Sequence, residues 1–235
     1  MSRQQGRAPR GAFALAMSVV ITALVGFGFS FTFMADVVGR LRPLILYIHV
    51  ASAALWLLLL VLQAFLVRRG QVGLHRRLGG WGIWLGAIAA VSAFATTVVL
   101  RQQKIALHPG NLETIAFLAV PLPGAILFSL FFVLGVRARR IPAHHRRYML
   151  LAAAILPGPA LARIPGADEI MLSDITTTAL VMILCAHDVI TQRRVHPINM
   201  AGLALFILLP QIAQRYLFEQ QPDWWIAFAR AVTGA

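Results

Sequence analysis

Long apolar runs, separated by short polar connections, account for most of the chain. Seven of them approach the length of about 20 residues that lets an α-helix cross a bilayer; they cover 12–34, 43–67, 80–100, 114–136, 147–164, 170–191 and 197–214. The fifth is interrupted by Leu156-Pro157-Gly158-Pro159, and buried neighbours can satisfy the backbone groups that such prolines free. We therefore predict an all-α polytopic transmembrane bundle of about seven spans over residues 1–217.

Residues 218–235 follow the last run and form a separate tail. The tail contains the pair Trp224-Trp225 with apolar neighbours, which is typical of a helix that lies at a membrane interface. A frayed tail is the alternative, and the sequence leaves both open.

Composition supports a bilayer as the solvent. Only 12% of the 235 residues are charged and 59% are hydrophobic, whereas soluble domains carry about 25% charged residues. The net charge of +13 raises a nucleic-acid partner as an alternative. We reject it because the basic residues form short clusters between apolar runs, so membrane lipids are the expected partners.

The distribution of Lys and Arg predicts the orientation. Alternate connections, beginning with the amino-terminal tail, hold 14 of them, and the other set holds 7. Because the richer set is normally cytoplasmic, we expect the amino terminus inside and, after seven spans, the carboxyl terminus outside. The first run follows three arginines but is longer than the 7–15 residues of a signal-peptide core, so we interpret it as an uncleaved span.

Two ionisable residues fall in the predicted outer half of the membrane. His49 lies on one helical face with Ser52, Trp56 and Gln63, and Asp174 lies near the start of the sixth run. Such groups within a span are usually functional or paired with each other, so we predict that His49 and Asp174 are coupled. A hydrogen bond from His49 to a neighbouring helix, and direct access of Asp174 to water, are the alternatives.

Proline pairs occur at a similar outer depth in the fourth and fifth runs. Pro121-Leu122-Pro123-Gly124 and Leu156-Pro157-Gly158-Pro159 each break the helical hydrogen-bond ladder. Two broken helices at one depth predict a cavity near His49, although proline is also simply more frequent in membrane helices.

Three histidines gather at the predicted cytoplasmic side. His75 and His145 open two runs after arginine-containing turns, and His187 lies near the end of a third. Imidazole nitrogens suit haem iron as axial ligands. Neighbouring arginines suit the haem propionates because guanidinium binds carboxylate in a fork geometry; these are Arg76, Arg77, Arg146 and Arg147. We predict a b-type haem held by His75 with His145 or His187, and interfacial side chains that contact lipid phosphate are the alternative.

One part of the chain resembles known membrane proteins. His49, Gln63 and the run His75-Arg76-Arg77-Leu78-Gly79 resemble one helix pair of the cytochrome b561 type. With His145-Arg146-Arg147-Tyr148-Met149, residues 43–165 more closely resemble a family of uncharacterised bacterial membrane proteins. The first resemblance implies haem ligated by histidines near each side of the membrane. His49 has no outer histidine partner, so it implies at most one inner haem here.

Two functional classes follow from these observations. The first is a haem-binding electron-transfer protein of the bacterial cytoplasmic membrane, with His75 and His145 as metal ligands. The second is a cofactor-free transporter, or a lipid- or small-molecule-binding protein, with an outer cavity at His49 and Asp174. The single cysteine, Cys185, excludes an internal disulfide and a cysteine-based metal cluster. The common phosphate-loop, zinc-helix and nucleophile-elbow motifs are missing, and the sequence leaves open whether the protein is an enzyme.

Overall fold

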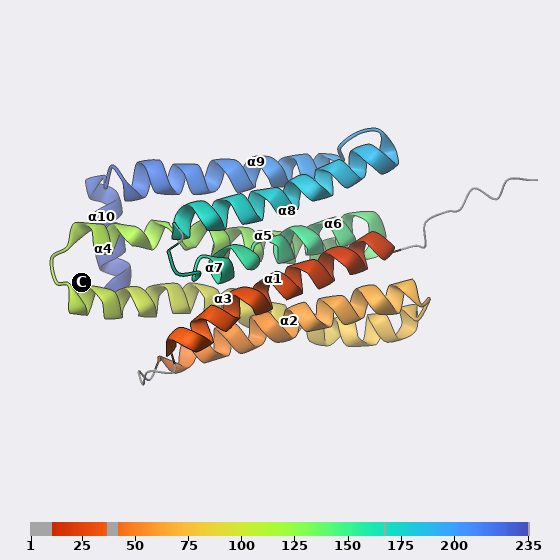
Figure 1. Ribbon diagram of the computed structural model, residues 1–235, viewed down its shortest axis with the longest axis horizontal. Coiled ribbons are helices and arrows are strands. Elements are labelled where there is room, and N and C mark those ends of the chain that lie inside the picture. Colours follow the sequence, from red (N-terminus) through yellow and green to blue (C-terminus); the bar gives the residue numbers. More distant parts are fainter. Residues whose placement is uncertain (1–10, 37–41, 167, 235) are drawn as a thin grey trace, which may run out of the picture.

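The computed structural model describes residues 11–36, 42–166 and 168–234, and over these residues it contains helices and turns but no strand (Figure 1). Six helical segments are long and apolar enough to cross a membrane. They contain α1 (Ala12–Asp36), α2 (Leu44–Arg68), α3 (Val72–Leu107), α5 (Leu122–Arg137), α8 (Glu169–Gln192) and α9 (Pro197–Ile212). The prediction of an all-α bundle of the multi-pass membrane type is confirmed.

Shorter helices complete the chain. They are α4 (Leu112–Ala116), α6 (Pro142–Ala154), α7 (Pro157–Leu161) and α10 (Asp223–Thr233). A 3-10 turn, Phe117–Ala119, joins α4 to α5, and a π-helical turn, Ala213–Phe218, extends α9. The predicted fifth span is thus two helices rather than one. Pro157 begins α7, where its fixed φ and missing N–H are tolerated, and this position separates α7 from α6.

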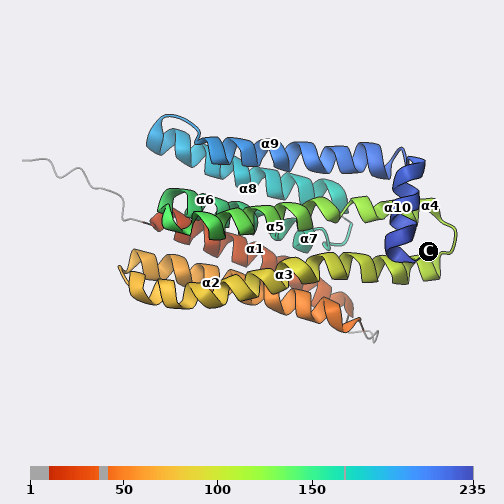
Figure 2. The ribbon, with the colours of Figure 1, turned by 180° about the vertical axis from the view of Figure 1, so that it is seen from behind.

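The helices run side by side, and their connections alternate between two ends (Figures 1 and 2). One end, called the basic end below, contains the start of α1 and the turns at 69–71, 138–141 and 193–196. The opposite end contains α4, α10 and the connection between α7 and α8. Together α6 and α7 carry the chain from the basic end toward the opposite end, and α7 packs between α1 and α8.

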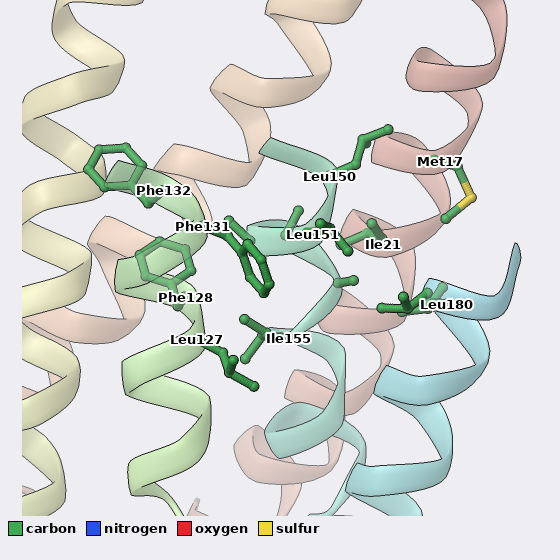
Figure 3. Close-up of a cluster of buried hydrophobic side chains, with 14 of the residues drawn as sticks. Met17, Ile21, Leu127, Phe128, Phe131, Phe132, Leu150, Leu151, Ile155 and Leu180 are labelled. Carbon is green, nitrogen blue, oxygen red and sulfur yellow. The ribbon is translucent and has the colours of Figure 1, made fainter. Parts of the chain in front are cut away.

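The main core lies in the middle of the bundle (Figure 3). It contains three phenylalanines of α5 together with aliphatic side chains of α1, α6 and α8. Close backbone contact accompanies this core, because a Cβ added at Gly158 on α7 would lie 2.6 Å from Ser173 Oγ on α8. Small residues at helix contacts are typical of membrane proteins, in which packing replaces the hydrophobic effect as the driving force.

The carboxyl-terminal tail is helical rather than frayed. Helix α10 crosses the bundle direction at the opposite end and packs against α3 and α4 (Figure 2). Trp225 is 4% exposed and donates from Nε1 to the carbonyl oxygen of Ala116 at 3.2 Å, whereas Trp224 is 56% exposed. A second small core forms around Trp225, and the paired tryptophans therefore face in different directions.

Candidate functional site

Two of the predicted ligands, His75 and His145, lie together at the basic end. His75 is in the first turn of α3 and His145 is in the first turn of α6. Their ring centroids are 6.5 Å apart, the ring planes are inclined by 79°, and both side chains are half-buried. The sequence left both His145 and His187 as partners for His75, and the fold brings His145 to it.

Each ring contacts the backbone and keeps one nitrogen free. His145 Nδ1 lies 2.8 Å from the carbonyl oxygen of Gly135, so Nδ1–H donates and Nε2 retains its lone pair. The His75 ring interacts with the backbone of Gln63, and its buried Nδ1 has no hydrogen-bond partner among the described residues. Metal-ligating histidines commonly donate their other ring N–H to a carbonyl or carboxylate. The pair therefore presents nitrogens suited to ligation.

Gln63 on α2, whose backbone interacts with the His75 ring, also carries buried polar side-chain atoms. Both Nε2 and Oε1 of Gln63 are buried, and neither has a hydrogen-bond partner among the described residues. Leaving an amide buried without hydrogen bonds costs roughly 2–7 kcal/mol. The site thus offers a donor and an acceptor that a bound group can satisfy.

The set of residues fits haem better than a bare metal ion. Within residues 11–36, 42–166 and 168–234, no three His, Cys, Asp or Glu side chains are grouped to hold a metal ion. Haem iron receives four ligands from its porphyrin and needs only two axial ones from the protein. His75 on α3 and His145 on α6 are the two candidates for these axial positions.

The arginines predicted for the propionates are on the same helices. Arg77 follows His75 in α3, Arg146 follows His145 in α6, and both are exposed at the basic end. Arg147 differs, because it is 5% exposed and has another partner. Arg76 is also exposed, so three of the four named guanidinium groups are accessible at the basic end.

His187 occupies a different position. Its ring stacks on Phe13 of α1, with centroids 3.6 Å apart and planes inclined by 14°. It also lines a small cavity with Arg146 and Asp188. The ring partner of His187 is thus Phe13, whereas that of His75 is His145.

A buried ion pair that sequence reasoning missed lies next to this cavity. Arg147 Nη2 on α6 donates to Asp188 Oδ1 on α8 at 2.6 Å, and Asp188 is 2% exposed. Three further donors reach the same carboxylate: Gln192 Nε2 at 2.9 Å, the backbone N–H of His196 at 3.1 Å and Asn199 Nδ2 at 2.8 Å. The available signal was an acidic residue within an apolar run, which requires a partner.

His49 and Asp174 do not pair with each other. His49 Nδ1 lies 3.3 Å from Ser92 Oγ on α3, and Gln214 Nε2 donates to Asp174 Oδ2 at 2.8 Å. The expected coupling is therefore replaced by two separate contacts, one between α2 and α3 and the other between α8 and the π-helical turn. His49 matches the alternative of a histidine bonded to a neighbouring helix.

An open groove of about 420 Å³ lies beside Asp174. It is lined by Asp168, Asp174, Glu219, Gln211 and Gln214 together with apolar side chains of α8 and Phe218. His49 does not line it. Three of the eight acidic residues in a chain of net charge +13 thus surround one groove, which favours cations over anions.

The two proline motifs break their helices but do not line either cavity described above. Pro121 precedes α5, and Pro157 begins α7. Pro157 is almost fully inaccessible, and Gly158 lies in close contact with α8. The prolines described here therefore contribute to packing, and His49 lines neither the small cavity beside His187 nor the groove beside Asp174.

Comparisons with protein-family models, curated proteins and solved structures gave no match.

Proposed function

We propose that this chain is a multi-pass protein of the bacterial cytoplasmic membrane that binds b-type haem at its basic end for electron transfer. The observation that carries the proposal is the His75–His145 pair, with ring centroids 6.5 Å apart. His75 and His145 would hold the iron. Haem supplies one-electron chemistry when bound, and the protein supplies its ligands and their surroundings.

The residues around the pair have defined roles in this proposal. The carbonyl oxygen of Gly135 accepts from Nδ1 of His145 at 2.8 Å and fixes the tautomer that leaves Nε2 free. The exposed Arg77 and Arg146 neutralise acidic groups at the membrane surface. The buried Gln63 amide provides a polar partner inside the bundle.

The absorption spectrum of protein purified from haem-replete cells tests this proposal. We expect a Soret band and the reduced-state bands of low-spin bis-histidine haem. His75→Ala and His145→Ala should each abolish them, because either change removes an axial nitrogen. His187→Ala should retain them, since the His187 ring stacks on Phe13 instead.

Control variants separate ligation from folding. His108→Ala changes an exposed histidine at the far end of α3 and should leave the spectrum unchanged. A wild-type protein without a Soret band would overturn the haem proposal. Bands lost in His187→Ala but retained in His145→Ala would move the second ligand to α8.

We also propose seven crossings, with the amino terminus in the cytoplasm and the carboxyl terminus outside. Six segments qualify as spans by length and composition, and the α6–α7 pair would be the additional crossing. The bias of 14 against 7 basic residues supports the orientation. Reporter fusions after Arg69, Arg140 and Arg194 should report cytoplasm, and a fusion after Ala235 should report the outside. A cytoplasmic carboxyl terminus would exclude an odd number of crossings.

The groove beside Asp174 favours a second candidate function, the binding or transport of a small organic cation. Asp174 is half-buried, accepts from Gln214 Nε2 at 2.8 Å and faces further carboxylates across the groove. Tetraalkylammonium ions and primary amines should then raise the melting temperature of the wild type but not of Asp174→Asn. Equal stabilisation of both proteins would exclude the groove as the binding site.

A further inference from the structure

A small cavity of about 10 Å³ lies where α1, α6, α8 and α9 meet near the basic end. Its walls include Leu150 and Leu184, the ion pair of Arg147 and Asp188, and Asn199. Phe13 and His187, stacked at 3.6 Å, form another part of the wall. The cavity shares Arg146 with the proposed haem site but is lined by neither His75 nor His145, and it has no lining residue in common with the acidic groove.

Two buried polar atoms belong to the residues that line this cavity. Arg147 is 5% exposed and Asn199 is 3% exposed. Arg147 Nε and Asn199 Oδ1 have no hydrogen-bond partner among the described residues. The other polar atoms of these groups are occupied: both arginine Nη atoms donate within the protein, and Asn199 Nδ2 donates to Asp188 Oδ2.

The orientation of the Asn199 amide follows from its neighbour. Because the Asp188 carboxylate can only accept, Nδ2 must face it, and Oδ1 is left on the other side. One wall residue therefore needs an acceptor for Arg147 Nε–H, and another needs a donor for Asn199 Oδ1. Almost all buried polar groups of native proteins are paired with protein or ordered water.

Charge and size narrow the ligand to one class. An anion would satisfy Arg147 Nε but be repelled by Asn199 Oδ1 and Asp188. A cation would be repelled by Arg146 and Arg147. A neutral molecule that both donates and accepts suits both atoms, and a volume of about 10–15 Å³ holds one water. We propose that the cavity binds a single ordered water that bridges Arg147 Nε and Asn199 Oδ1.

This water completes a polar clamp between α6, α8 and α9. Arg147 and Asp188 link α6 to α8, and Asp188 and Asn199 link α8 to α9. The water adds the third link, from α6 directly to α9, and the stacked Phe13 and His187 rings close one side of its site. The clamp joins α6, α8 and α9 at the basic end, and it does so without a cofactor.

Radiolytic hydroxyl labelling of the full-length protein in H₂¹⁸O tests the proposal. An ordered water generates hydroxyl radicals beside its neighbours, so the buried Leu150 and Leu184, which line the cavity, should incorporate ¹⁸O within milliseconds. Leu151 is the matched control, because it is adjacent in α6, chemically identical and fully buried away from the cavity. We expect labelling of Leu150 to exceed that of Leu151 several-fold, as measured by tandem mass spectrometry.

A pair of variants gives an independent arm. Leu150→Phe fills the cavity and should reduce labelling of Leu184 toward the Leu151 level, whereas the volume-conserving Leu150→Met should not. Equal labelling of Leu150 and Leu151 in the wild type would overturn the proposal, even where Leu150→Phe fails to fold. Labelling of Leu184 that persists in a folded Leu150→Phe protein would also overturn it, since the label would then not come from a water in the cavity.

Discussion

The basic end and the opposite end of the bundle hold their helices together in different ways. At the basic end, the Asp188 carboxylate is 2% exposed and accepts four hydrogen bonds. One donor each lies on α6, on α8, in the connection between α8 and α9, and on α9. At the opposite end, the chain contains short broken helices, a π-helical turn and an open groove of about 420 Å³. Helices there are joined by close backbone contact and by the small core around Trp225.

This difference indicates how one membrane-type helix bundle can combine a tightly bonded end with an end that contains an open groove. Polar clamps are costly to bury but strong once every group is paired, so they fix the relative positions of the helices that they join. Contacts between small residues leave room for irregular backbone and grooves. The comparison predicts large stability losses from polar changes at the basic end and from steric changes at the opposite end.

The largest effect is expected for Asp188→Leu. The change leaves the Arg147 guanidinium buried without its counter-charge, which should cost about 3–5 kcal/mol of unfolding free energy. The double variant Arg147→Met/Asp188→Leu should recover much of this loss, because no charge remains buried. Equilibrium unfolding in mixed detergent micelles, followed by circular dichroism, measures both.

Asp174→Leu provides the comparison at the opposite end. Asp174 is half-buried and has Gln214 as its hydrogen-bond donor, so the loss should be about 1 kcal/mol. A loss for Asp174→Leu equal to that for Asp188→Leu would contradict the distinction between the two ends.

After Asp188→Leu, the next largest loss of unfolding free energy is expected for Gly28→Ala. A Cβ at Gly28 would overlap the backbone of Ala160 in α7, which cannot move as a flexible side chain can. Overpacking of this kind costs about 1–3 kcal/mol. Gly26→Ala is the control on the same helix, since nothing lies within 4 Å of its added Cβ. Gly26→Ala should be neutral or mildly stabilising in thermal unfolding, and equal losses at both positions would exclude the contact as the cause.

A smaller and local effect is expected for Trp225→Phe. The change removes the donor to the Ala116 carbonyl oxygen and should weaken docking of α10 by about 1 kcal/mol. Hydrogen–deuterium exchange of the α10 amides should accelerate, while exchange in α5 and α6 stays unchanged. Trp224→Phe alters a side chain 56% exposed and should leave α10 exchange at the wild-type rate.

The smallest effect concerns the cap of α9. His196 Nδ1 accepts from the backbone N–H of Ile198 at 3.2 Å, which requires a neutral ring. Burial and then the positive charge of Arg147 hold the pKa of His196 below its usual value, against the attraction of Asp188. Because the folded-state pKa is lowered, the cap stabilises above the unfolded value of about 6.5 and is lost as the pH falls below it.

The cap contributes about 0.5 kcal/mol, the low end for such residues. Comparing melting temperatures between pH 8 and pH 5, about one and a half units to either side of the unfolded value, measures it. His196→Ala should reduce the acid destabilisation, and His108→Ala at the opposite end should not. An unchanged pH dependence in His196→Ala would assign the effect to other groups.

Several features were accessible from the sequence because they depend on local chemistry. The lengths of the apolar runs predict where the long helices lie. The break at Leu156-Pro157 follows because proline cannot continue the preceding helix. The fourth run lies within one candidate span, Leu112–Arg140, as predicted, and a 3-10 turn ahead of Pro121 interrupts its helix. Helix α3, predicted as 80–100, extends over 36 residues because its polar ends are also helical.

Because successive connections alternate between the two ends of the bundle, the sequence alone predicts that His75 and His145 lie at the same end. Both histidines begin helices that start from the same side of the bundle, so the sequence alone restricts them to one depth. It cannot select between His145 and His187, since both satisfy that restriction. Their partners depend on which helices are neighbours and on how each helix is rotated about its axis.

Tertiary structure therefore decided every pairing between distant residues. Asp188 and Asp174 each lie within an apolar run, and this position indicates that each carboxylate needs a partner. It does not indicate that Arg147 pairs with Asp188 and Gln214 with Asp174. The length of an apolar run and the position of a basic cluster can be determined from consecutive residues alone. Hydrogen bonds, ion pairs and cavities instead need atoms from distant segments that packing brings within a few ångströms of one another. The sequence by itself determined a helical membrane bundle with histidines at its basic end, and only the fold determined which side chains meet there.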